Sequence, residues 1–235
     1  MGEHLTIADS KRAFHQAFPY VIPSLYRRTA DELLVELHLL SHQKTFQVDA
    51  LFAVGLQQVF NAFTRGYRPE EHLPSLFNAL CSCNGFDADQ LRQLAASSED
   101  AVQGHSMDDV QRWLHDKGAG APEAVASVLN RADQENFHYS RLMAVGLLTL
   151  LAKARGQDGA DPKELAQSAH ELSEPLGLSK DRVEKDLGLY LSNLERMAQA
   201  VELVEETLAA ERRKRERQDD GLSVEVESSA TGSSN

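Results

Sequence analysis

The 235-residue chain has little cysteine, which excludes two classes of protein. Two cysteines, Cys81 and Cys83, are too few to staple a secreted scaffold or to complete a four-thiolate zinc site. On a helix, residues two positions apart point about 200° away from each other, so this pair can neither chelate a metal nor close a disulfide. We therefore expect two free thiols, one of them buried and one on a polar face.

Basic residues and long apolar runs are also scarce. Lys and Arg number 24 against 36 Asp and Glu, a net charge of −12, which argues against nucleic acid as a partner because phosphate neutralisation needs a basic surface. The longest apolar run extends only from Leu142 to Ala152, whereas a transmembrane helix requires roughly 18 apolar residues. We expect this run to be a buried core helix and any membrane contact of the protein to be peripheral.

No hairpin signal is present, and the seven prolines stand where helices would begin or end. Apolar residues recur instead at helical spacing. A helix from Pro23 to about Gln43 is predicted by one such stripe, and another is predicted from Phe137 to Arg155. The sequence predicts an all-α fold, a multi-helix bundle with a long C-terminal amphipathic or coiled-coil helix.

The C-terminal helix shows the most regular pattern. Its apolar residues are spaced alternately four and three apart, which is a heptad seam. A helix over residues 179–217 would extend about 58 Å at ~1.5 Å per residue, so we expect its far end to project from the bundle. The predicted organisation is a helical bundle over 1–178, a coiled-coil helix over 179–217, and a disordered, polar, Ser-rich tail over 218–235.

This helix supplies the candidate interaction surface. The seam is apolar and wide, and it is followed by a basic cluster in an otherwise acidic chain. Favourable charge at a helix C-terminus is a simpler explanation of that cluster than contact with an acidic partner or an anionic lipid surface. Self-association through the seam is also possible. The seam comprises Leu187, Tyr190, Leu194, Met197, Val201, Val204 and Leu208, and the basic cluster comprises Arg212, Arg213, Lys214, Arg215 and Arg217.

No motif of an enzyme or a nucleotide-binding protein is found, so we expect no catalytic residues and no cofactor. Histidines give one alternative from another class of protein. His38 and His42 lie one helical turn apart, and His138 belongs to a Glu-x-x-His motif. A helical metal- or pigment-binding protein using His38, His42 or His138 is therefore a second hypothesis. The simpler interpretation of His38 and His42 is that they lie on a polar face.

Several long strings resemble the thylakoid formation protein family, the photosystem II biogenesis factor of cyanobacteria and chloroplasts. They occur in family order over roughly residues 6–217. The strings are Thr6–Phe14, Ile22–Arg27, Asp31–Ser41, Gly66–Glu70, Phe137–Leu142, Arg182–Leu187, Asn193–Met197 and Glu211–Arg215.

The resemblance implies a non-enzymatic, all-helical accessory factor in photosystem II assembly and repair. It further implies an adaptor role with FtsH-type membrane protease complexes. The implied location is peripheral, on the cytoplasmic side of the thylakoid membrane and partly soluble in the cytoplasm. Chloroplast members carry a transit peptide that is absent here, so a cyanobacterial form is expected.

Overall fold

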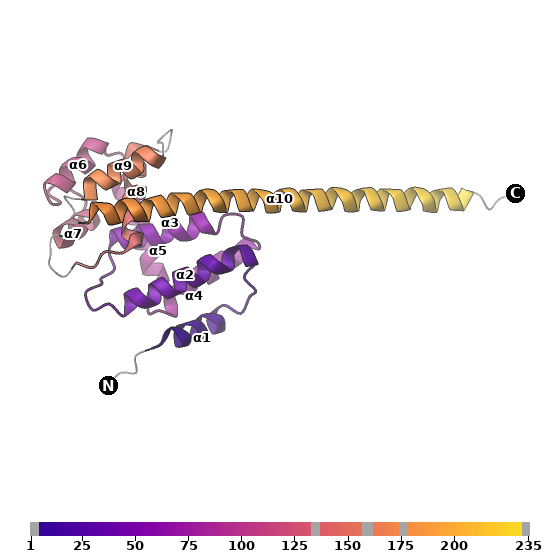
Figure 1. The fold of residues 1–235 in the computed structure, drawn as a ribbon, viewed down its shortest axis with the longest axis horizontal. Helices are drawn as coiled ribbons and strands as arrows, with labels where there is room; N and C mark the ends of the chain where they lie inside the picture. Colours follow the sequence, from indigo (N-terminus) through magenta and orange to yellow (C-terminus); the bar gives the residue numbers. More distant parts are fainter. Residues whose placement is uncertain (1–4, 133–136, 157–161, 174–177, 232–235) are drawn as a thin grey trace. The chain divides into compact units, whose positions relative to one another are not determined.

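The computed structural model describes residues 5–132, 137–156, 162–173 and 178–231 (Figure 1). These residues form helices and contain no strand, which confirms the all-α prediction. The helices are α1 (Ile7–Ala17), α2 (Ser24–Ser41), α3 (Ala50–Phe63), the 3-10 turn η1 (Glu70–His72), α4 (Leu73–Ser82), α5 (Ala88–Val102), α6 (Met107–His115), α7 (Glu123–Ala132), α8 (Arg141–Arg155), α9 (Pro162–Ser173) and α10 (Lys180–Thr231).

Side-chain caps fix where several helices begin. Thr6 caps α1 and Ser106 caps α6, each in a reciprocal capping box with the aspartate three residues later. The helix predicted from Phe137 begins only at Arg141, so this boundary was wrong. The reason is local: the Ser140 hydroxyl accepts a hydrogen bond from the backbone N–H of Leu142 and so caps α8.

Helices α3 and α8 form the centre of the core. α3 is buried on nearly all sides, and it packs more extensively on α8 than on any other helix of the described residues. The two backbones approach most closely where Gly55 faces Leu142 and Gly146 faces Leu51. A Cβ atom on either glycine would overlap the carbonyl oxygen of the facing leucine. Only glycine, whose side chain is a hydrogen atom, therefore fits at these two positions of the helix crossing.

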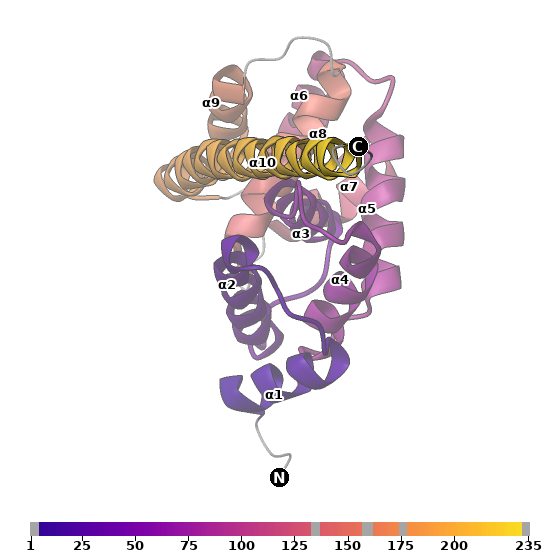
Figure 2. The same ribbon diagram turned by 90° about the vertical axis from the view of Figure 1, so that its right-hand side faces the viewer.

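The other helices of residues 1–194 surround this pair. α1 packs on α2 and α4 at one end, and α6 and α9 pack on α8 at the other end (Figure 1, Figure 2). α5 packs on α3, α4 and α8. The helices of the bundle thus bury their apolar stripes against one another, as a multi-helix fold requires.

The chain divides into two compact units, Met1–Leu194 and Glu195–Asn235. The sequence predicts the boundary between bundle and C-terminal helix at residue 178. The heptad pattern does not show that the first turns of α10 belong to the bundle. Helix α10 also continues to Thr231, whereas the sequence predicts that the helix ends at 217 and that a disordered tail follows. Gly221 and the serines after it disfavour a helix only weakly, and no proline follows to stop it. Residues 232–235 lie outside the described residues.

Candidate docking surface on helix α10

The first part of the seam is core rather than accessible surface. Leu187 and Tyr190 are buried, as is Val183 before them. The Tyr190 ring lies edge-on to Phe63 of α3, with 6.0 Å between the ring centroids. A partner cannot reach these positions in this structure, which corrects the sequence-based expectation that they belong to an interaction surface. Deleting residues 179–217 would therefore open the core of the bundle.

A polar cluster holds the beginning of α10 in place. The Tyr139 hydroxyl donates a hydrogen bond to Asp186 Oδ2 at 2.9 Å, and the Arg182 guanidinium lies over the Tyr139 ring at 5.1 Å. Burial, and next the charge of Asp186, raise the pKa of Tyr139. Beside it, Arg141 bonds Glu36 of α2 at 2.6 Å.

These contacts join sequence blocks that are far apart in the chain. Tyr139 and Arg141 belong to the block 137–142, Glu36 to the block 31–41, and Asp186 to the block 182–187. Three of the strings that carry the family resemblance therefore meet at one joint between α2, the start of α8 and α10. No local pattern predicts this proximity, because no periodicity relates the three blocks.

Further along α10 the apolar residues become exposed. Met197 is buried, while Leu194 and Val201 are half-buried. Val204 and Leu208 are 46% and 48% exposed. Leu203 is 64% exposed, and the seam did not include it because it falls between heptad positions. Leu203 lies on another side of the helix, at least 100° away from Val201, Val204 and Leu208. We call Val201, Val204 and Leu208 the docking stripe.

The basic cluster follows the docking stripe directly. Arg212, Arg213, Lys214 and Arg215 are exposed, and the side chain of Arg217 lies outside those that the structure describes. At about 100° per residue, four consecutive residues surround a helix. Positive charge is therefore presented on every side of α10 one turn after Leu208.

The three histidines of the metal or pigment hypothesis do not form one site. His38 is buried rather than on a polar face, because α1 covers it and Ser10 Oγ lies 2.9 Å from its Nδ1. His42 is exposed and donates from Nδ1 to the His38 carbonyl at 2.8 Å. The His138 ring instead lies near Phe46, at 6.3 Å. No group of three or more His, Cys, Asp or Glu among the described residues is placed to hold a metal ion.

Burial of His38 makes the protein's stability depend on pH. Burial, and next the charge of His42, lower the pKa of His38 below its usual 6.5. The unfolded chain then binds the proton more readily, so stability is full above pH 6.5 and falls as the pH drops toward the pKa of folded His38. We expect His38→Asn to lose less stability than the wild type between pH 7.5 and pH 5 in urea unfolding. Replacement of the exposed His115 should leave the pH dependence of stability as it is in the wild type. If His38→Asn also showed the wild-type pH dependence, its assignment to His38 would be wrong.

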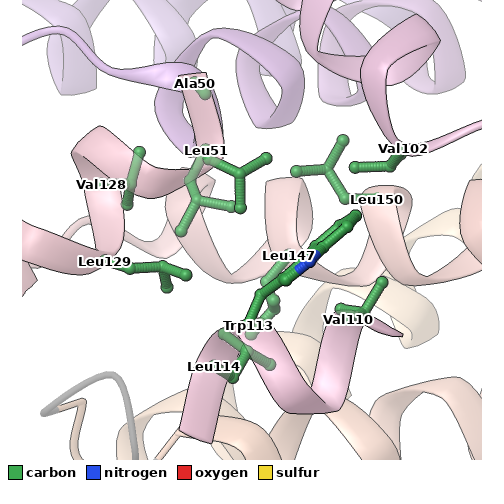
Figure 3. A pocket seen from close by; sticks show the side chains of 11 residues that line it. Ala50, Leu51, Val102, Val110, Trp113, Leu114, Val128, Leu129, Leu147 and Leu150 are labelled. Carbon is green, nitrogen blue, oxygen red and sulfur yellow. The ribbon is translucent and has the colours of Figure 1, made fainter. Parts of the chain in front are cut away.

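A small cavity lies between α3, α5, α6, α7 and α8, and its lining is apolar (Figure 3). Its volume is about 30 Å³, room for about one water molecule. Trp113, Leu147 and Leu150 are among the side chains around it. Because no polar surface faces the cavity to orient a ligand, it is a packing defect and not a substrate pocket.

One free thiol is buried, as the sequence predicted, whereas the other is half-buried and not on an exposed polar face. Cys81 is buried and Cys83 is half-buried. Burial raises the pKa of Cys81 to about 12 and that of Cys83 to about 11. Both sulfurs are therefore protonated at neutral pH, which makes them poor nucleophiles and poor metal ligands.

Together these features define an all-α protein whose candidate site is an amphipathic helix surface. Among the described residues, no helix has the length and apolar character needed to cross a bilayer. The family model described as thylakoid formation protein matches residues 6–219. The chain belongs to the thylakoid formation protein family, as its sequence strings predicted.

Relatives in cyanobacteria support this assignment over most of the chain. Protein Thf1 of Prochlorococcus marinus (strain MIT 9313) is 64% identical over 217 residues, which cover 92% of this chain and 89% of the relative. Protein Thf1 of Synechococcus elongatus (strain ATCC 33912 / PCC 7942 / FACHB-805) is 42% identical, with 89% and 84% covered. A solved structure of Psb29 is 35% identical with a TM-score of 0.77, and the match covers 90% of this chain and 98% of that one.

Proposed function

We propose that this protein is a non-enzymatic adaptor in photosystem II assembly and repair that binds FtsH-type membrane protease complexes. It acts at the cytoplasmic face of the thylakoid membrane and contacts that membrane peripherally. Family membership supports a thylakoid role, and the name Psb29 of the similar solved structure is consistent with photosystem II. The docking stripe and the basic cluster are the surface through which the adaptor binds.

The observation that carries this proposal is that Val204 and Leu208 are exposed one turn apart on the same face of α10 as the half-buried Val201. Fully burying an apolar side chain contributes roughly 1.5–3 kcal/mol, so a partner that covers these three gains a substantial part of its binding free energy. The basic cluster adds attraction toward an acidic partner surface.

Capture of the protease complex tests the proposal. Tagged protein is incubated with detergent-solubilised photosynthetic membranes, and the bound FtsH subunits are quantified by immunoblot. We expect Val204→Asp/Leu208→Asp to capture at least about tenfold less than the wild type, because two carboxylates would have to be desolvated in the interface. Circular dichroism should show unchanged helix content, since both residues are exposed.

A matched variant controls for added charge. Gln199→Asp/Ala210→Asp introduces the same two charges at exposed positions roughly opposite Val204 on the helix. It should capture the protease complex like the wild type. Equal capture by Val204→Asp/Leu208→Asp would show that the docking stripe is not the binding surface.

A further inference from the structure

The charges around the docking stripe have a definite order along the helix. At about 100° per residue, Val201, Val204 and Leu208 share one face of the helix. Glu205 and Arg212, seven residues apart, lie along one edge of that face, and Lys214 lies along the other. Glu206 and Arg213 point away from it. Beyond Leu208 the same face continues with Glu211 and Arg215, so its apolar part ends there.

A second copy of this chain is a poor occupant of the docking stripe. Two parallel copies in register would place Glu211 against Glu211 and Arg215 against Arg215. Two antiparallel copies with Val204 packed on Leu208 bring the two Glu205 carboxylates together. A shift by one heptad places Glu205 beside Arg212 but packs Leu208 against Glu211. Each pairing therefore sets like charges together or loses the apolar contact.

We infer that the docking stripe receives an amphipathic helix of a different protein, one that is acidic where it lies beside Arg212 and Lys214. This inference rests on the proposed function and names the chemistry of its partner. The apolar face of the partner packs over Val201 to Leu208, a length of about two turns. The acidic residues of the partner helix then lie beside the basic cluster. A partner helix with a basic or apolar end binds poorly at this place.

Electrostatics decides the choice of partner because the apolar contact is short. Packing over two turns accepts any amphipathic helix, whereas charges at the edges discriminate among them. Exposed ion pairs are individually weak, so the preference is the sum of several and is screened by salt. Binding should therefore weaken as the salt concentration rises.

Synthetic helical peptides test the inference on the purified full-length protein. Three peptides share one apolar stripe of about three heptads and carry Glu, Gln or Lys at the flanking positions of one end. Fluorescence anisotropy measures their binding. We expect the Glu peptide to bind about tenfold more tightly than the Lys peptide, with the Gln peptide between them. Equal affinities, or tighter binding of the Lys peptide, would overturn the inference.

Two adjacent residues provide the matched variants. Arg212→Glu reverses a charge at the edge of the docking stripe, and Arg213→Glu makes the same change on the far side of the helix. We expect Arg212→Glu to weaken binding of the Glu peptide about fivefold and to strengthen binding of the Lys peptide. Arg213→Glu should change the ratio of the two affinities little. An equal effect of both variants would mean that only the net charge of α10 matters, and the inference would be wrong.

Sedimentation of the purified protein at two concentrations tests whether a second copy of this chain occupies the docking stripe. We expect no dimer that depends on the docking stripe. A dimer that Val204→Asp dissolves would show that a second copy covers this face. Failure of the adaptor proposal gives a different pattern, namely peptide discrimination with no capture of the protease complex. Capture of the complex without peptide discrimination would overturn only the inference about charge.

Discussion

Replacing Gly146 with alanine is expected to lower the free energy of unfolding by about 3 kcal/mol or more. The added Cβ would overlap the carbonyl oxygen of Leu51, a backbone atom that no rotamer change can move. α3 and α8 would have to separate, and the side chains packed along them would lose contact. Since domains are typically stable by only about 5–15 kcal/mol, urea unfolding should show a clearly earlier midpoint.

Gly55→Ala should be destabilising for the same reason, because its Cβ would overlap the Leu142 carbonyl oxygen. Gly188 provides the control within the same chain. It lies inside α10, and a Cβ atom there would meet nothing within 4 Å. Gly188→Ala should therefore stabilise the protein by about 0.5–1 kcal/mol through helix propensity. Unfolding midpoints that are the same for Gly146→Ala and Gly188→Ala would refute the close crossing.

The second large effect is expected for Arg131→Met, which removes the partner of a buried carboxylate. Asp49 Oδ2 accepts from Arg131 of α7 at 2.6 Å, and Asp49 Oδ1 accepts from the backbone N–H of Phe52 at the start of α3. The Asp49 side chain is only 2% exposed. Leaving such a charge without its partner typically costs about 3–5 kcal/mol, so we expect a loss of about 3 kcal/mol at pH 7.5 in urea unfolding.

The pH dependence identifies Asp49 as the cause. Burial already raises the pKa of Asp49, although the Phe52 N–H and Arg131 oppose this. Without Arg131 the pKa rises further, so the folded variant binds a proton at higher pH than the unfolded chain does. The deficit relative to the wild type should therefore shrink as the pH falls toward that pKa.

A surface arginine serves as the control for Arg131→Met. Arg28 pairs with Glu32 one helical turn away, and its side chain is 88% exposed. Arg28→Met should change the stability by less than about 0.5 kcal/mol. A deficit in Arg131→Met that stays constant with pH would mean that lost packing, and not the charge of Asp49, causes the effect.

Local signals predicted helix boundaries well where a side chain itself forms the cap. Thr6 and Ser106 each precede an aspartate by three residues, and this spacing indicates a cap because the hydrogen bonds of a capping box join residues three apart. The start of α8 was missed although Ser140 is a good capping residue. The apolar pattern continues back through Phe137, and periodicity alone does not show where a helix begins.

The candidate site was predicted only in part. The seam identified α10 and its heptad positions, but not which of them are covered. Tyr190 is buried against Phe63, more than one hundred positions earlier in the chain, and only folding brings the two together. His38 was assigned to a polar face for a similar reason, since the sequence does not show that α1 packs there.

By itself the sequence determined the fold class, the family and the existence of a long amphipathic helix, because helical spacing, caps and long matching strings are local properties of the chain. Only the tertiary structure decided which apolar residues of α10 are accessible, where Gly55 and Gly146 permit two backbones to touch, and that Tyr139, Glu36 and Asp186 share one joint. These are contacts between residues distant in sequence. Burial depends on what the rest of the chain places against a side chain, and no local pattern encodes that neighbour.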